Sequence, residues 1–165
     1  MIPARRYSMA ISWLAIAGTV VLAACASQGP LTQEPAQPAG PPEIPPAIKP
    51  AEIIGRWGFA AYHKPDDRAR TEAAAARQCR QPVNIGAGPT GGVMMYLADS
   101  NKLEELRLKG APGNKTFVGP AGEAGGMQDR EIVSFDGRVM IMRFVDPEVA
   151  GRYGTSVYVR CGPRA

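Results

Sequence analysis

The chain has few of the side chains on which metal and enzyme sites most often depend. Its 165 residues include one histidine, His63, and three cysteines, Cys25, Cys79 and Cys161. Their spacing matches no zinc-binding pattern, in which ligands come in close pairs. The longest apolar run, residues 9–24, has 16 residues, and a permanent membrane span needs roughly 20. We therefore expect no metal centre and no cofactor.

The N-terminal residues have the layout of a secretory signal peptide over 1–24. Arg5 and Arg6 precede the apolar run, and small residues lead from it to Cys25. The ending Leu22-Ala23-Ala24-Cys25 resembles the lipobox of bacterial lipoproteins. That resemblance implies cleavage before Cys25 and a covalent lipid on its thiol. Since Ala26 follows, it also implies the outer membrane, facing the periplasm. An uncleaved transmembrane anchor is the alternative.

The net charge is too small to indicate a nucleic-acid partner. Removal of residues 1–24 takes away Arg5 and Arg6 and no acidic residue, so the formal charge falls from +4 to +2. Residues 86–91 match the glycine pattern of a dinucleotide-binding loop, Gly-x-Gly-x-x-Gly. However, a strand rather than a helix is expected after them. We therefore expect neither nucleic acid nor nucleotide, and we interpret 86–91 as a hairpin loop.

Proline is concentrated between Cys25 and the folded domain. Eight of the 16 prolines lie in residues 26–50. Proline fixes φ and removes an amide donor, so this composition favours extended polyproline II structure. We expect residues 25–50 to be a lipidated tether of up to roughly 75 Å. A ligand for a proline-recognition groove is the alternative.

The two remaining cysteines form an even pair. With Cys25 assigned to a lipid by resemblance, Cys79 and Cys161 would lie together in an oxidising compartment, where such a pair predicts a disulfide. Free thiols or a metal site are the alternatives. The bond would join the end of a helix to the last strand. It would close a loop of about 83 residues, worth about 4.5 kcal/mol by loop-closure entropy.

The globular domain is expected over 51–165, with one helix and several strands. Alanine-rich residues 68–80 predict the helix, with Asp66 as its cap and Pro82 after its end. Asp136-Gly137 between two apolar runs predicts a tight hairpin. Strand-like segments lie at 52–62, 93–98, 103–108, 116–118 (short), 131–135, 138–144 and 155–161. The fold class is α+β: a small antiparallel β-rich domain, sheet or barrel-like, with an N-terminal helix and about six strands.

Gly55-Arg56-Trp57 opens the first strand. It resembles the Gly-x-Trp signature of lipocalins and of the small barrel inhibitors of secreted bacterial metalloproteases. That resemblance implies that Trp57 closes one end of a barrel and that Arg160, on the last strand, packs across its ring. The alanine-rich helix directly after this strand departs from both families. An ordinary core tryptophan beside a glycine is the alternative.

Several residues are candidates for catalysis or contact. His63 with Asp66 could transfer protons, and the acidic pairs at 129–131 and 146–148 could cleave glycosides if they converge. Solvated loops and surface ion pairs are the alternatives. Residues 146–154 are long for a strand connection, and their mixed composition makes Arg152 and Tyr153 candidate partner contacts. Trp57 is a third candidate.

The methionine-rich strand at 138–144 bears on the core. Met140 and Met142 share a face with Phe144, and the opposite face carries Val139 and Ile141. Because both faces are apolar, we expect a central strand packed in the core. A binding groove lined by methionines is the alternative.

These observations predict a lipid-anchored cell-envelope protein with a non-enzymatic binding or structural role. Its expected partners are the outer-membrane bilayer and an envelope protein or enzyme. An inhibitor of a protease or lysozyme is the first alternative, and a small-ligand carrier or a hydrolase the next. A carrier would show an apolar cavity of on the order of a few hundred Å³.

Overall fold

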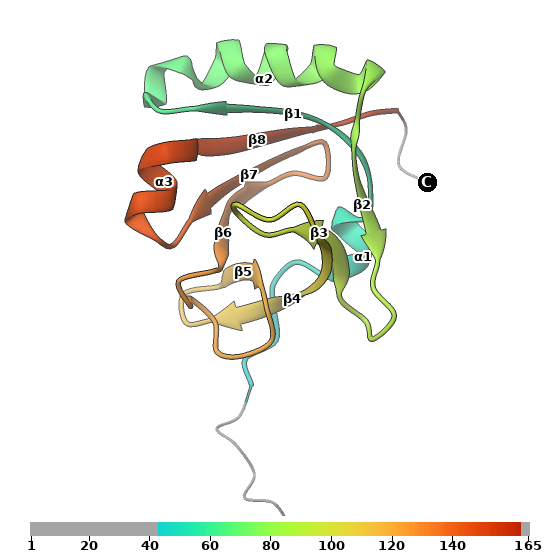
Figure 1. The fold of residues 1–165 in the computed structure, drawn as a ribbon, viewed down its shortest axis with the longest axis vertical. Helices are drawn as coiled ribbons and strands as arrows, with labels where there is room; N and C mark the ends of the chain where they lie inside the picture. Colours follow the sequence, from blue (N-terminus) through green and yellow to red (C-terminus); the bar gives the residue numbers. More distant parts are fainter. Residues whose placement is uncertain (1–42, 163–165) are drawn as a thin grey trace, which may run out of the picture. The chain divides into compact units, whose positions relative to one another are not determined.

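Each strand pairs with its neighbour in the sequence, and the last returns to the first. The computed structural model describes residues 43–162. They form a closed barrel of antiparallel strands in the order β1 to β8 (Figure 1). The strands are β1 (Gly55–Tyr62), β2 (Val83–Ala87), β3 (Val93–Tyr96), β4 (Leu103–Ala111), β5 (Lys115–Gly119), β6 (Arg130–Phe135), β7 (Val139–Phe144) and β8 (Thr155–Arg160). The expected α+β, β-rich fold is confirmed in its barrel form.

The start of the domain differs from the sequence prediction. Residues 52–54 do not belong to the first strand, because a short helix, α1 (Pro50–Ile53), precedes β1. Its first turn is capped by the Glu52 carboxylate, which accepts the amide of Lys49 at 2.8 Å. Residues before it already contact the barrel: the amide of Ala47 donates to the Thr116 hydroxyl at 3.1 Å. The folded part thus begins before residue 51. The predicted signal peptide, Cys25 and the tether up to residue 42 lie outside the described residues.

Two further elements were not expected. β2 is five residues long and includes Asn84 and Gly86, so it carries little strand signal. Residues 146–154 contain a helix, α3 (Pro147–Tyr153), rather than a loop. Asp146 caps it by accepting the amides of Glu148 and Val149, and Pro147 occupies the first turn. This Asp-Pro start is a helix signal, whereas the sequence prediction treated residues 146–154 as a strand connection.

The barrel interior is filled at the end where β1 begins. Trp57 is fully buried there, and its indole nitrogen donates to the carbonyl oxygen of Ile53 in α1 at 2.9 Å. The Arg160 guanidinium lies 4.1 Å from the Trp57 ring centroid, as the lipocalin resemblance implied. Buried side chains from all strands complete this cluster: Ile53, Trp57, Ile85, Val93, Met95, Leu106, Leu108, Val118, Ile132, Met140, Met142 and Tyr158.

A second apolar cluster lies outside the barrel wall, under α2 (Arg68–Arg77). It joins Ala75 of the helix to the outward faces of β7 and β8, at Val139, Ile141, Val157 and Val159. Both faces of β7 are therefore buried, as its sequence predicted. The last three residues of the expected helix form a 3₁₀ turn, η2 (Gln78–Arg80), and another 3₁₀ turn, η1 (Pro65–Asp67), precedes the helix. No helix within residues 43–162 is long and apolar enough to cross a membrane.

The predicted disulfide is present between Cys79 in η2 and Cys161 after β8, with 5.4 Å between the Cα atoms. It joins the end of the helix to the last strand, as expected. A disulfide of this kind indicates a compartment outside the cytoplasm. Residues 88–92 form the loop of the β2–β3 hairpin, which confirms the interpretation of the glycine-rich segment as a hairpin loop, although its first two residues, Gly86 and Ala87, belong to β2.

Candidate functional site

A cavity of about 720 Å³ occupies the barrel end opposite α1. The walls come from the second half of β1, the beginning of β2, the end of β3, the first residue of β6, the last residue of β7 and the beginning of β8. Its rim is formed by helix α3 and by the turn that follows β3. An eight-stranded barrel has an interior just wide enough to be filled by side chains or to hold one small ligand. Here one end is filled by the Trp57 cluster and the other is hollow.

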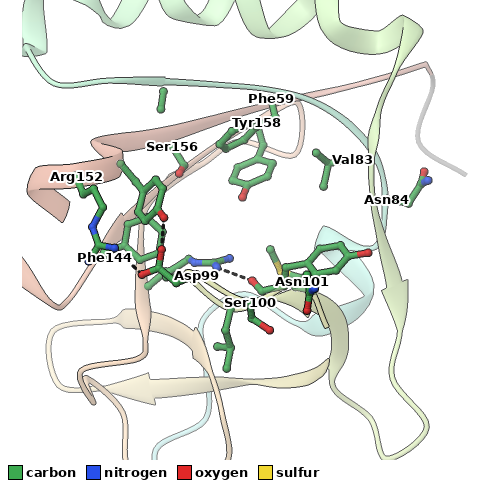
Figure 2. A pocket seen from close by; sticks show the side chains of 17 residues that line it. Phe59, Val83, Asn84, Asp99, Ser100, Asn101, Phe144, Arg152, Ser156 and Tyr158 are labelled. Atoms are coloured by element: carbon green, nitrogen blue, oxygen red, sulfur yellow. Dashed lines mark hydrogen bonds and ion pairs between the residues drawn. The ribbon is translucent and has the colours of Figure 1, made fainter. Parts of the chain in front are cut away.

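Aromatic and apolar side chains form most of the cavity wall. Phe59 and Tyr158 pack together with 5.1 Å between ring centroids, and Figure 2 shows both rings beside the hollow. Phe144 and Tyr153 form a second aromatic pair at 5.9 Å. Phe59 is 39% exposed although it belongs to the inward face of β1, because the hollow leaves part of its ring uncovered.

Arg130 places a positive charge inside this apolar cavity. It shares the inward face of β6 with Ile132, and it is only 7% exposed. Its guanidinium donates to the carbonyl oxygen of Tyr96 at 2.5 Å and lies 4.9 Å from the Phe144 ring centroid. Within residues 43–162, Arg130 has no carboxylate partner. The cavity therefore contains a buried cation without a counter-charge from these residues.

Two hydroxyl groups of β8 also line the cavity, those of Ser156 and Tyr158. Burial raises the pKa of the Tyr158 hydroxyl, and the positive charge of Arg130 lowers that pKa by a smaller amount. Tyr158 is therefore protonated at neutral pH and can donate a hydrogen bond. Arg130 and Tyr158 together make this part of the cavity a place for an acceptor or an anion.

Asp99, Arg152 and Tyr153 form a cluster at the rim, which we call the rim cluster. Asp99 lies in the turn after β3 with a positive φ of 58°. It accepts a hydrogen bond from the Arg152 guanidinium at 2.9 Å and another from the Tyr153 hydroxyl (Figure 2). The hydrogen bond to Asp99 raises the pKa of Tyr153. The rim cluster thus joins α3 to the β3–β4 turn across the mouth of the cavity.

The three candidate contact residues are found in two places. Arg152 and Tyr153 lie together at the cavity rim, on a helix rather than on the expected loop. Trp57 is fully buried at the other end of the barrel, so its ring is not available to a partner. Its contacts with Ile53 and Arg160 give it a structural role.

None of the candidate catalytic groups lines the cavity. His63 is exposed, and neither it nor Asp66 lines the cavity. Asp129 is buried in an ion pair with Lys109 at 2.7 Å, whereas Glu131 pairs with Arg143 and Lys115. Within the described part of the chain, no group of three or more histidine, cysteine and acidic side chains could hold a metal ion.

Arg130, the main feature of the cavity, was not among the site residues predicted from the sequence. A signal was present, because Arg130 and Ile132 lie two apart in β6 and must therefore share a face. Asp99 carried no comparable signal, since its partners Arg152 and Tyr153 are more than 50 residues away. Such a contact follows only from the closure of the barrel.

Comparison of the chain with models of protein families, with curated proteins and with solved structures finds no match. The barrel architecture is established by the pairing of its strands.

Proposed function

We propose that this protein is a non-enzymatic binding protein of the cell envelope that holds a small, largely apolar molecule in the barrel. The observation that carries the proposal is the cavity of about 720 Å³ with its aromatic wall. Ligand sites for small molecules are commonly about 300–1,000 Å³ and mostly apolar, with a few placed polar groups. The cavity fits this description in both size and lining.

The location is part of the same proposal. The Cys79–Cys161 disulfide supports a site outside the cytoplasm. The resemblance of Leu22-Ala23-Ala24-Cys25 to a lipobox supports a lipid on Cys25 and attachment to the outer membrane. The proline-rich residues after Cys25 would hold the barrel at a distance from the bilayer. An inhibitor of a protease or lysozyme stays a prediction from the sequence.

A neutral fluorescent probe tests the proposal. We would titrate N-phenyl-1-naphthylamine into residues 25–165 carrying Cys25→Ser, exported behind a signal peptide that is cleaved without lipidation, so that neither the predicted lipid nor the apolar run 9–24 calls for detergent. Ala61 lines the cavity and is exposed, so the indole of Ala61→Trp should occupy part of the hollow and weaken probe binding about tenfold, a loss of about 1.4 kcal/mol. The matched control is Ala73→Trp on the exposed face of α2, which should bind as the parent does. Equal binding by both variants, or no binding by the parent, would contradict the proposal.

A further inference from the structure

Arg130 differs from the other arginines around the barrel interior in what surrounds it. The Arg160 guanidinium donates to the carbonyl oxygens of Glu52, Ile54 and Gly137. Arg152 at the rim is paired with Asp99. For the Arg130 side chain, the structure of residues 43–162 shows one hydrogen bond, to the carbonyl oxygen of Tyr96, and one aromatic contact, with Phe144.

A buried guanidinium without a counter-charge is unfavourable. Arginine remains charged at all ordinary pH values, so it cannot respond to burial by losing its proton. Buried charges in proteins are generally paired, because desolvation of an isolated ion is costly. Arg130 also has more donors than its one hydrogen bond uses. A ligand bound in the cavity beside Arg130 could supply the missing negative charge and hydrogen-bond acceptors.

The groups near Arg130 suit an acid. A guanidinium presents parallel N–H donors that match the two oxygens of a carboxylate. The Tyr158 and Ser156 hydroxyls line the same cavity and can donate further hydrogen bonds. The one carboxylate that lines the cavity, Asp99, is at the rim and already binds Arg152 and Tyr153. The interior is therefore positive, and its walls are apolar.

We propose that the ligand is an anionic amphiphile whose carboxylate pairs with Arg130, while its apolar part lies against Phe59, Met95 and Phe144. This inference rests on the proposed function and makes it more specific. It predicts discrimination by charge among molecules of the same length, because Arg130 is attracted to an anion, gains little from a neutral group and repels a cation.

Three twelve-carbon probes test the inference on the same exported protein, residues 25–165 with Cys25→Ser. Dodecanoate, dodecanol and dodecyltrimethylammonium share the apolar tail and differ in the charge of the head. Binding is measured by calorimetry below the micelle concentrations. Loss of one partner of a buried, hydrogen-bonded charge pair weakens binding on the order of 30-fold or more. We expect dodecanoate to bind at least that much more tightly than dodecanol, and the ammonium compound to bind most weakly.

Variants of Arg130 assign the preference to this residue. Arg130→Gln should lower dodecanoate affinity on the order of 30-fold and leave dodecanol nearly unchanged. Arg130→Lys should recover part of the loss, since it keeps the charge but not the paired donors. The matched control is Arg143→Gln, which removes an arginine from β7 that pairs with Glu131 and does not line the cavity. It should bind all three probes as the parent does.

The outcomes separate this inference from the proposed function. Equal affinity for dodecanoate and dodecanol, or a preference that survives Arg130→Gln, overturns the anionic ligand and leaves a binding barrel. Failure of the parent to bind the neutral naphthylamine overturns the proposed function itself. If circular dichroism shows that Arg130→Gln is unfolded, the comparison of the three probes on the parent protein decides.

Discussion

At the scale of single residues, Gly58 determines how closely α2 approaches β1. A Cβ atom at this position would lie 2.0 Å from the carbonyl oxygen of Ala75 and 3.3 Å from the sulfur of Cys79. The first contact is with backbone, which cannot rotate away as a flexible side chain can. Only glycine therefore allows the helix to lie on the barrel at this distance, with Ala75 fully buried beneath it.

We predict that Gly58→Ala lowers the free energy of unfolding by about 2–3 kcal/mol, because the helix must move off the strand. The control is Gly151→Ala in α3, where a Cβ would meet nothing within 4 Å. That change should raise the free energy of unfolding by up to about 1 kcal/mol, since alanine is the better helix former. Urea unfolding measures both. An unchanged midpoint for Gly58→Ala would show that α2 is free to shift.

A second single-residue feature is the buried ion pair of Lys109 and Asp129. The Lys109 ammonium also donates to the carbonyl oxygens of Pro120 and Glu123, and Asp129 accepts the amides of Gly125 and Gly126. These contacts hold the glycine-rich connection between β5 and β6 against the outer face of β4. Both side chains are nearly inaccessible to water.

We expect Asp129→Asn to lower the free energy of unfolding by about 3 kcal/mol, because it leaves the Lys109 charge buried without a counter-ion. Glu148→Gln provides the comparison. It removes an exposed pair with Arg152 and should change stability by less than about 0.5 kcal/mol. Thermal or urea unfolding distinguishes the two. Similar small effects for both would mean that water reaches Lys109 readily in the folded protein.

At the scale of elements, the disulfide joins η2 to the end of β8 across a separation of 82 residues. We predict that Cys79→Ser with Cys161→Ser lowers the free energy of unfolding by about 2–5 kcal/mol, because the unfolded chain gains the freedom of a long open loop. Urea unfolding with and without a reductant measures the loss. The reductant should destabilise the parent by a similar amount and leave the double variant unchanged. A loss below about 1 kcal/mol would mean that apolar packing alone holds η2 against the end of β8.

The β6–β7 hairpin depends on the carboxylate of Asp136. It accepts the amides of Val139 at 2.6 Å and Arg138 at 2.8 Å. These backbone hydrogen bonds, with that of Val139 the stronger, hold the pKa of Asp136 below its usual value. Gly137 completes the turn with a positive φ of 85°, as the Asp-Gly signal predicted.

This lowered pKa has a consequence for stability at low pH. Because the folded-state pKa is below that of the unfolded chain, the contribution of Asp136 is fully present above about pH 4 and is lost as the pH falls through the lowered value. Asp136→Ala should therefore destabilise the protein more at pH 7 than at pH 3, measured by urea unfolding. Asp136→Asn does not titrate, so its difference from Asp136→Ala should stay constant. A gap between parent and Asp136→Ala that widens toward pH 3 would contradict this account.

At the scale of the whole barrel, the rim cluster connects two segments that are distant in the sequence. Asp99 belongs to the turn after β3, and Arg152 and Tyr153 belong to α3 between β7 and β8. The Arg152 and Asp99 side chains are 47% and 45% exposed, so their pairing adds little to stability. Because the pair lies at the cavity mouth, we expect it to slow the entry and release of a ligand.

We predict that Asp99→Asn speeds probe release about two- to fivefold, since the exposed ion pair contributes up to about 1 kcal/mol. Asparagine tolerates the positive φ of this position, so the free energy of unfolding should change by less than about 1 kcal/mol. Stopped-flow displacement of the naphthylamine measures the rate. Glu148→Gln, at the other contact of Arg152, is the control and should release the probe as the parent does. Slower or unchanged release in Asp99→Asn would exclude the rim cluster as a barrier.

Local features were read correctly from the sequence where short-range chemistry decides structure. The alanine-rich helix, the Asp136-Gly137 hairpin and the glycine-rich loop after β2 each depend on neighbours within a few residues. The short β2 was missed, since its pairing with β1 is what makes it a strand. α3 was missed although its Asp146-Pro147 start was visible, because the whole segment was interpreted as a contact loop.

The sequence by itself determined the strand-rich domain, the burial of both faces of β7 and the pairing of Cys79 with Cys161. These follow from alternation, turn chemistry and an even number of cysteines in an oxidising compartment. Only the tertiary structure decided that the strands close into a barrel, that one end is filled and the other hollow, and that Arg130 lies in the hollow. The reason is physical: strand alternation selects the face on which a side chain lies, but barrel closure decides which side chains share the enclosed space and how much of it they leave open.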